Sequence, residues 1–231
     1  MTATNIRQNL DVLGERMARA AGRAGRSLHD ITVVAVTKEV PVPRILEAVE
    51  CGVTDLGENR VQEARGKVCR VTGVRWHMIG HLQSNKARPA LEMFDLIHSL
   101  DRPSLLEALS RHAQRLGKVA RVLVQVNTSR ESAKSGVDPD RAAEFVVTAG
   151  TTPGILVEGL MTIGPLEGGP AAARLGFATL RELARELEAA RLPGVSMRYL
   201  SMGMSADFEV AIEEGANLVR IGTAIFGHRR F

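Results

Sequence analysis

The sequence predicts an α/β fold, a single closed (β/α)8 barrel of the TIM type preceded by an extra helix. Eight strand-like segments alternate with helical segments over 231 residues, and no change in composition divides the chain. Parallel strands need helical crossovers of this kind. An open doubly wound sheet would carry a glycine-rich turn after its first strand. The first strand here continues instead into Lys38-Glu39-Val40-Pro41, so we expect one barrel domain spanning residues 1–231.

An amphipathic helix is expected at the N-terminus, within residues 1–26. Apolar residues recur at helical spacing from Ile6 to Met17 with polar residues between them, and Gly22 and Gly25 end the pattern. We expect this helix to pack on the outside of the barrel.

The barrel strands are expected where β-branched and other apolar residues cluster. They should begin near Ile31, Val53, Arg75, Phe94, Val119, Ile155, Val195 and Leu218. Helical periodicity fills the segments between them, at 43–51, 59–71, 84–91, 103–116, 139–149, 171–190 and 206–215. Proline near several helix starts and glycine near several helix ends agree with these boundaries.

The composition argues against several classes of protein. Aromatic residues make up 3% of the chain and the net charge is +4 without a run of like charges, which disfavours nucleic-acid binding. The two cysteines, Cys51 and Cys69, form no CxxC motif and have no histidine at metal-ligand spacing, so no metal site is expected. No segment approaches the ~20 apolar residues of a membrane helix or has the pattern of a signal peptide. We expect a cytoplasmic protein that contacts no membrane.

Lys38 is the first candidate for chemistry, because it closes the apolar run that begins at Ile31. Such a run predicts a buried strand with the ammonium group at its carboxyl end. In (β/α)8 barrels the functional face is built at the carboxyl ends of the strands. A strand-end lysine that simply reaches solvent is the alternative interpretation.

Two segments resemble phosphate cradles and follow the seventh and eighth strands, where barrel phosphate sites commonly lie. In the first, Ser201-Met202-Gly203-Met204-Ser205, Gly203 allows close backbone approach and Ser205 is expected to cap the next helix. In the second, Gly222 and Thr223 open a short C-terminal helix. Backbone N–H groups at helix starts favour anions.

Barrel closure brings these features together. The eighth strand pairs with the first, so Lys38 should lie beside Gly222 and Thr223. An amine next to a phosphate site indicates a phosphorylated aldehyde held as a Schiff base. Pyridoxal 5′-phosphate (PLP) fits, because its aldehyde and its phosphate arm stand on adjacent ring carbons and can span both sites.

Arg220 lies two positions before Gly222, so both side chains should face the barrel mouth. One interpretation is an ion pair with Glu58 or Asp207. The other places Arg220 against the pyridine nitrogen of PLP, where a permanently charged donor keeps that nitrogen unprotonated. Asn59 has two possible roles as well, a hydrogen bond to the phenolic oxygen of the ring or a cap on the next helix.

Several further residues lie near the expected mouth. His81, near the end of the third strand, is expected to line the pocket, and His77, inside that strand, to be a satisfied structural histidine. Met161, late in the sixth strand, is expected to pack against the ring. Lys134, after the fifth strand, is a second amine near the same face, and the interpretation preferred here is a loop lysine in solvent.

The assembled motifs resemble the pyridoxal phosphate homeostasis protein family, single-barrel PLP-binding proteins related to the N-terminal domain of alanine racemase. The match spans from Ile31 to the C-terminus. The matching segments are Ala35-Val36-Thr37-Lys38, Gly57-Glu58-Asn59 with Val61-Gln62-Glu63, 76–86 (Trp76-His77 through Gln83-Ser84-Asn85-Lys86), Lys134-Ser135-Gly136, Gly159-Leu160-Met161, Ser201-Met202-Gly203-Met204-Ser205 with Asp207, and 219–227. Thr37 stands where the family often has serine.

The resemblance implies a PLP barrel of fold-type III and assigns roles. Lys38 would carry the Schiff base and Arg220 would face the ring nitrogen, while Asn59 and Met161 line the ring. The phosphate would be held by Ser201, Met204, Ser205, Gly222 and Thr223. The family is described as controlling intracellular PLP and amino-acid balance without established turnover.

The expected function is therefore a PLP carrier or buffer, with PLP-dependent apoenzymes as possible recipients and a monomer as the expected state. A weak amino-acid racemase or decarboxylase is the alternative. A racemase of this class needs a second acid/base, which alanine racemase takes as a tyrosine from an added domain. Here the chain runs only to Phe231 and its single tyrosine, Tyr199, lies within the seventh strand. A barrel that binds another phosphorylated metabolite is a third hypothesis.

Overall fold

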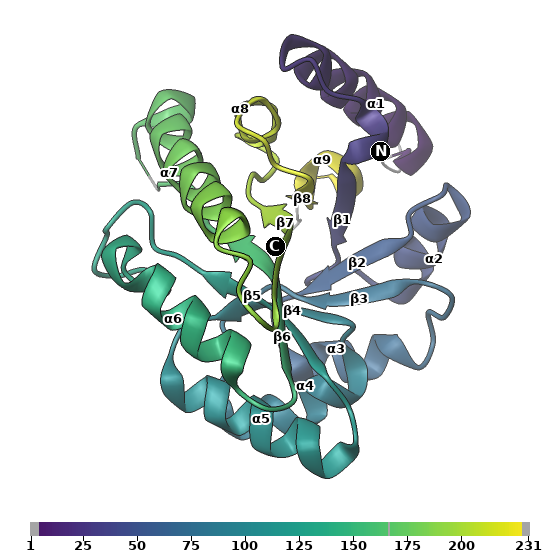
Figure 1. Cartoon of the computed structure of the whole chain (residues 1–231). Helices are drawn as coiled ribbons and strands as arrows, with labels where there is room; N and C mark the ends of the chain where they lie inside the picture. The colour runs from purple at the N-terminus through teal and green to yellow at the C-terminus, as the bar shows by residue number, and fades with distance from the viewer. Residues whose placement is uncertain (1–4, 166, 228–231) are drawn as a thin grey trace.

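The computed structural model describes residues 5–165 and 167–227. Eight parallel strands form a closed barrel in sequence order, with helices around the outside (Figure 1). The strands are β1 (Thr32–Val36), β2 (Asp55–Glu58), β3 (Arg75–Met78), β4 (Leu96–Leu100), β5 (Ala120–Gln125), β6 (Ile155–Met161), β7 (Val195–Ser201) and β8 (Leu218–Ile221). The predicted fold class is confirmed.

The helices follow the predicted order with shifted ends. They are α1 (Ile6–Arg23), α2 (Val42–Glu50), α3 (Val61–Val68), α4 (Ala87–Met93), α5 (Pro103–Leu116), α6 (Pro139–Thr151), α7 (Gly169–Ala189), α8 (Phe208–Glu213) and α9 (Thr223–Phe226), with short 3-10 turns at η1 (Leu28–Asp30) and η2 (Ser84–Lys86). The helix expected at 59–71 is shorter, because Asn59 and Arg60 remain extended or irregular before α3. The expected 84–91 helix is divided between η2 and α4.

Barrel closure joins β8 to β1 in parallel, with Ala35 opposite Ile221. Alternation of side chains then separates two apolar layers. One lies between the strands and the outer helices. The other fills the barrel and takes one residue from each of six strands, Val34, Leu96, Leu123, Met161, Tyr199 and Leu218. This inner layer supports the mouth at the carboxyl ends of the strands.

The N-terminal helix α1 packs against α8 and α9 (Figure 1). Asn5 caps it by accepting a hydrogen bond from the Gln8 amide, and its buried face includes Leu13 and Met17. Asn9 donates to the Ile225 carbonyl at 2.7 Å, which ties α1 to the chain that follows β8. Residues 1–4 of the predicted 1–26 segment lie outside the described residues.

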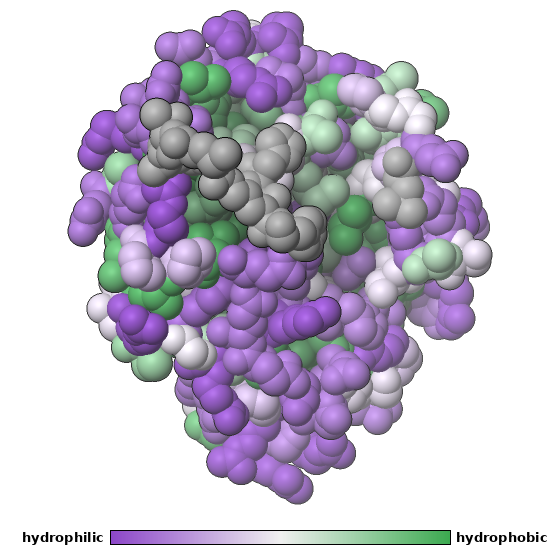
Figure 2. Space-filling view, turned by 180° about the vertical axis from the view of Figure 1, so that it is seen from behind, coloured by the Kyte–Doolittle hydropathy of each residue, from purple (hydrophilic) through white to green (hydrophobic). Residues whose placement is uncertain are grey.

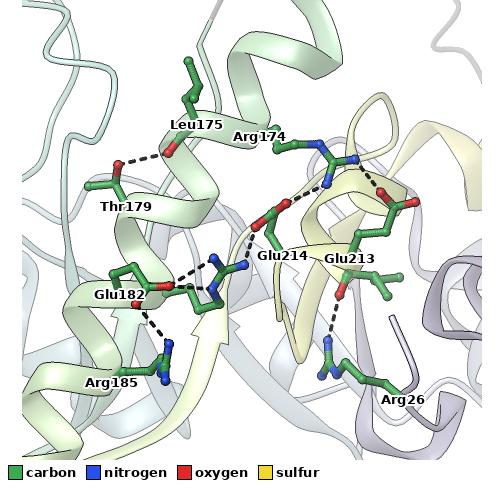
Figure 3. A network of polar contacts seen from close by, with 10 residues as sticks. Arg26, Arg174, Leu175, Thr179, Glu182, Arg185, Glu213 and Glu214 are labelled. Carbon is green, nitrogen blue, oxygen red and sulfur yellow. Dashed lines mark hydrogen bonds and ion pairs between the residues drawn. The ribbon is translucent and has the colours of Figure 1, made fainter. Parts of the chain in front are cut away.

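Outer helices are also joined by ion pairs, which Figure 3 shows from close by. The members of this α7–α8 network are Arg174, Arg181, Glu182, Arg185, Glu213 and Glu214. Arg26 donates to the carbonyls of Ile212 and Ala216 and so links the chain after α1 to α8. These contacts hold α8 directly behind the β7 loop, one of the two predicted phosphate segments.

The outer surface is mainly polar on the face shown in Figure 2. Hydrophilic residues cover most of that face, and hydrophobic residues stand in small groups, mainly in its upper half. Outer helices whose apolar stripes turn toward the strands give such a distribution. No helix in the described ranges is long and apolar enough to cross a membrane.

Candidate functional site

A cavity of about 730 Å³ opens at the carboxyl ends of the strands. This volume lies within the usual range for small-molecule and cofactor sites. Most of the predicted site residues are on its wall: Lys38, Asn59, His81, Met204, Ser205, Arg220, Gly222 and Thr223. The folded chain thus brings together the strand-end lysine and both predicted phosphate segments.

Three predicted residues are not on the cavity wall. Met161 is fully buried in the inner apolar layer, the same cluster that contains Ile79, which does line the cavity. Ser201 is fully buried, and its hydroxyl contacts His98 and Arg220. These positions favour indirect roles beneath the wall.

Gly203, the third of them, acts through its backbone. Its φ of +91° favours glycine, and a Cβ there would lie 2.5 Å from the Cβ of Ala211. Its carbonyl accepts a hydrogen bond from the Arg220 amide at 3.0 Å. Glycine at this position therefore lets the β7 loop turn between α8 and β8.

Lys38 follows β1 and lines the cavity. The residues on either side of it are held in place. The Thr37 hydroxyl donates to Glu58 Oε1 at 2.5 Å, and the Glu39 amide donates to Glu63 Oε1 at 2.5 Å. Glu39 has a φ of +61°, a left-handed conformation that is uncommon outside glycine. The backbone is thus fixed around an ammonium group that has no hydrogen-bond or ion-pair partner within 5–165 and 167–227.

The supporting contacts form a compact polar cluster, the Lys67 cluster, which consists of Thr37, Glu58, Glu63 and Lys67. Lys67 Nζ donates to the Thr37 carbonyl at 2.7 Å, to Glu58 Oε1 at 2.7 Å and to Glu63 Oε1 at 2.6 Å. Glu58 is fully buried. Burial raises the pKa of Glu58, and the hydrogen bonds from Lys67 and Thr37 offset only part of that effect.

Lys134 differs from the prediction. Its side chain is only 12% exposed, and it lies on the cavity wall. Nζ donates to Ser129 Oγ at 3.3 Å, to Glu131 Oε1 at 2.9 Å and to the Gly164 carbonyl at 2.8 Å. The interpretation as a solvent lysine is wrong because acceptors from its own loop and from the chain after β6 enclose it. An ammonium has three donors, and here all three have acceptors.

The two phosphate segments meet at the cavity, although Ser205 does not cap α8. That helix begins at Phe208, and its N-cap is Asp207, whose Oδ1 accepts from the Met204 amide at 2.6 Å. The cap prediction was wrong because the chain makes a further turn before α8 begins. Ser205 Oγ instead lies 3.5 Å from the Ala224 amide nitrogen, which joins the β7 loop to the start of α9. Thr223 begins α9, as predicted.

Arg220 lies at the base of the cavity and is 4% exposed. NH1 donates to Ser201 Oγ at 2.7 Å and NH2 to the Thr162 carbonyl at 2.8 Å. Burial lowers the pKa of Arg220 to about 10, and the charge of Asp207 opposes that shift. Of the two carboxylates considered from the sequence, Asp207 acts on Arg220 through its charge, whereas Glu58 is bound to Lys67.

Asn59 makes no cap on α3, whose N-cap residue is Arg60 without a side-chain hydrogen bond. The capping alternative is therefore excluded, and Asn59 faces the cavity. Gly80 packs directly on its backbone, since a Cβ on Gly80 would lie 2.4 Å from the Asn59 carbonyl oxygen. This close approach holds the β2 and β3 ends together.

The two predicted histidine positions agree with the structure. His81 lies on the wall with its side chain 49% exposed, and its Nδ1 is 3.3 Å from Asp101 Oδ2 and 3.2 Å from Ser135 Oγ. His77 is fully buried and bonded on both ring nitrogens, to Asp55 and His98.

Sequence reasoning missed two interior polar residues. Gln125 lines the cavity and donates to the Ser135 carbonyl at 2.9 Å. His98 is fully buried within β4. In both cases the available signal was a single polar residue inside an apolar strand, which needs a buried partner.

Comparisons with known proteins agree with this geometry. The model of the family "alanine racemase, N-terminal domain" matches residues 5–230. A pyridoxal phosphate homeostasis protein of Aquifex aeolicus is 42% identical over 229 residues, which are 98% of this chain and 100% of the relative.

Solved structures with the same barrel fold include two at 37–39% sequence identity. An unknown protein from Bifidobacterium adolescentis matches with a TM-score of 0.90 at 39% identity, over 96% of this chain and 94% of its own. PipY of Synechococcus elongatus, solved with PLP bound, has a TM-score of 0.79 at 37% identity over 92% of this chain and 100% of its own. The chain therefore belongs to the pyridoxal phosphate homeostasis protein family, whose barrel is that of the alanine racemase N-terminal domain.

Proposed function

We propose that this chain binds PLP, holds it as a Schiff base on Lys38, and acts as a PLP carrier or buffer in PLP homeostasis. One observation carries the proposal. Within the described ranges, Lys38 has no internal acceptor, whereas Lys134 on the same cavity wall donates to three acceptors. An uncommitted amine beside the hydroxyls of Ser205 and Thr223 suits an aldehyde that carries a phosphate arm.

The wall residues suit the parts of PLP. Lys38 Nζ would bond to the aldehyde carbon, and the aldehyde oxygen would leave as water. Ser205 and Thr223, with the backbone around Met204 and Gly222, would hold the phosphate. Arg220 would donate to the ring nitrogen and Asn59 to the phenolic oxygen. PLP supplies an electron sink in enzymes, and a charged arginine at the ring nitrogen weakens that sink.

The relatives support this proposal. The Aquifex relative, which aligns with this chain over its whole length, is named pyridoxal phosphate homeostasis protein. The PipY structure contains PLP. We extend that role to this chain and further propose that it works in the cytoplasm as a monomeric single domain. PLP would leave by exchange of Lys38 for another amine, with PLP-dependent apoenzymes as recipients.

We also propose that the chain has no physiological turnover. A racemase needs a second acid/base across the cofactor. The chain's single tyrosine, Tyr199, is packed in the inner apolar layer and is 7% exposed, so it is not positioned for that role. We expect racemisation of alanine to stay at the rate of free PLP; a rate well above that control would favour the racemase alternative.

The test is an absorption spectrum of the PLP-loaded protein before and after borohydride, followed by peptide mass mapping. We expect a yellow band and a phosphopyridoxyl group on Lys38. Lys38→Ala should lose both, while Lys118→Ala, which removes a lysine bonded to Leu91 on the outside of the barrel, should keep both. A wild-type protein that stays colourless and unlabelled after added PLP contradicts the proposal, as does an unchanged band in Lys38→Ala.

A further inference from the structure

A continuous line of hydrogen bonds crosses the barrel interior and ends at Arg220. We call it the interior chain; it consists of Asp55, His77, His98, Ser201 and Arg220, one residue from each of five strands. Asp55 Oδ1 lies 2.9 Å from His77 Nε2, and His77 Nδ1 lies 2.9 Å from His98 Nε2. His98 Nδ1 lies 2.9 Å from Ser201 Oγ, which accepts from Arg220 NH1 at 2.7 Å.

One assignment of donors gives every group in this line a single direction, with both histidines neutral. Arginine only donates, so Ser201 Oγ accepts from Arg220. In this assignment the single hydroxyl hydrogen of Ser201 goes to His98 Nδ1. His98 then carries its proton on Nε2 and donates to His77 Nδ1. His77 likewise carries its proton on Nε2 and donates to the Asp55 carboxylate. In this arrangement both imidazoles are neutral. The opposite direction, in which Ser201 Oγ accepts from both Arg220 and His98, would require a doubly protonated His77.

The electrostatics of the interior agree with this assignment. Burial, together with the charges of Arg220 and Arg75, holds the pKa of His98 well below its ordinary value. Burial raises the pKa of Asp55, but hydrogen bonds from His77 and Thr54 outweigh it, so that pKa is lowered overall and Asp55 is a carboxylate. The line therefore connects a buried cation at the mouth to a buried anion deep in the barrel.

The line also accounts for the position of Arg220. Within the described residues Arg220 donates no hydrogen bond to a carboxylate; its acceptors are Ser201 Oγ and the Thr162 carbonyl. A buried guanidinium needs its donors satisfied and its charge compensated. With two of its nitrogens anchored on the interior side, the remaining N–H groups are available to whatever occupies the cavity that Arg220 lines.

We propose that Asp55, His77, His98 and Ser201 are positioning residues that fix Arg220 as a charged, one-way hydrogen-bond donor to the ring nitrogen of PLP. Because Arg220 can donate a hydrogen bond but not give up its proton, the ring nitrogen stays unprotonated. The proposal rests on the function proposed above. It makes the protonation state of the PLP ring nitrogen depend on four residues that do not line the cavity.

The first test uses the cofactor-free protein with ¹⁵N-labelled histidine. NMR of the ring nitrogens should find His77 and His98 neutral at pH 7, each protonated on Nε2. A proton on Nδ1 of either ring, or a doubly protonated ring, reverses or breaks the line and overturns the proposal. This measurement needs no PLP, so it stands apart from the test of the proposed function.

The second test compares variants loaded with PLP that is ¹⁵N-labelled in the ring. Wild type and His112→Leu, which changes a histidine on α5 outside the barrel, should show an unprotonated ring nitrogen. His98→Leu should shift that signal toward the protonated position and weaken PLP binding about tenfold, since a buried donor loses its partner. Arg220→Glu removes the arginine donor altogether and so gives the largest expected shift of the ring-nitrogen signal, against which the other variants are compared.

Asp55→Asn serves as a variant that keeps the size and shape of the side chain, in case His98→Leu does not fold. It can still accept from His77 but removes the carboxylate, and it should shift the ring signal in the same direction by a smaller amount. If PLP binds and both variants leave the ring signal at the wild-type position, the positioning role is overturned and the function proposed above survives. If wild type binds no PLP, both proposals fail.

Discussion

The buried part of the molecule and the outer surface of α7 and α8 both contain networks of charged and polar residues, and the two networks differ in their access to water. In the α7–α8 network Glu214 is only 11% exposed, but every pair has one side chain that is at least 35% exposed, so water competes for every pair (Figure 3). In the interior chain and the Lys67 cluster, by contrast, His77, His98, Ser201 and Glu58 are fully buried.

This difference decides what each network contributes. An exposed ion pair is screened and contributes about 0–1 kcal/mol. A buried charge has lost its hydration, so it depends on each of its partners and becomes costly when one is removed. The surface network therefore adds a small stabilisation, and losing one of its pairs should cost little. The buried groups depend on every partner, and they hold the side chains around the cavity in fixed positions.

The largest effect should come from removing Lys67, the buried cation that α3 places against Glu58 of β2. Lys67→Met leaves Glu58 buried without its ion-pair partner, and we expect the free energy of unfolding to fall by about 3–5 kcal/mol at neutral pH. Urea denaturation at pH 7.5 measures it. Lys118→Met, which removes one hydrogen bond to a carbonyl, should cost no more than about 1.5 kcal/mol. Equal losses of unfolding free energy in Lys67→Met and Lys118→Met would contradict the greater cost expected for an unpaired buried charge.

The same cluster should respond to pH in the variant. Because burial raises the pKa of Glu58, and Lys67→Met removes the group that lowers it, Glu58 should be uncharged in the variant at mildly acidic pH. The stability gap between wild type and Lys67→Met should therefore narrow as pH falls from 7.5 to 5.5. A gap that stays constant over this range would indicate lost packing rather than an unpaired charge.

An intermediate effect is expected from His98. The native state keeps His98 neutral, because its pKa lies well below the ordinary value of 6.5, whereas the unfolded chain takes up a proton near pH 6.5. The unfolded state thus binds more protons below that pH, and stability falls as pH decreases, by at most about 1.4 kcal/mol per pH unit for one histidine.

Denaturation curves between pH 8 and 5 check the sign and the slope. His98→Gln should flatten the slope below pH 6.5 relative to wild type, whatever its stability at pH 8. His29→Gln, at an exposed histidine of η1, should leave the slope as it is in wild type. An unaltered slope in His98→Gln would mean that His98 is protonated in the folded protein as readily as in the unfolded chain.

The smallest effect should come from the α7–α8 network. Arg174→Gln removes contacts to Glu213 and Glu214, and we expect a loss of no more than about 1 kcal/mol that disappears in about 1 M salt. Thermal or urea unfolding at low and high salt measures it. A loss as large as that of Lys67→Met, or one independent of salt, would show that the surface network acts as a buried one.

Much of the fold was available from the sequence because its signals are local. Runs of β-branched residues and helical periodicity repeat eight times along the chain, and parallel strands with helical crossovers close into a barrel. Closure then implied that Lys38 and Thr223, far apart in sequence, line one cavity, and they do. Motif and strand position were enough for this step.

Partner choice within the barrel was decided only by the tertiary structure. His98 and Ser201 lie 103 residues apart, and their contact depends on the stagger of strands around the closed barrel, which residue periodicity does not encode. For the same reason Lys134 has acceptors on a separate loop, and Ser201 bonds to Arg220 beneath the cavity. The sequence by itself determined the barrel and the strand ends that meet at its mouth. The tertiary structure determined which buried polar groups satisfy one another, because a hydrogen bond forms only when distant segments place donor and acceptor about 3 Å apart to within a few tenths of an ångström.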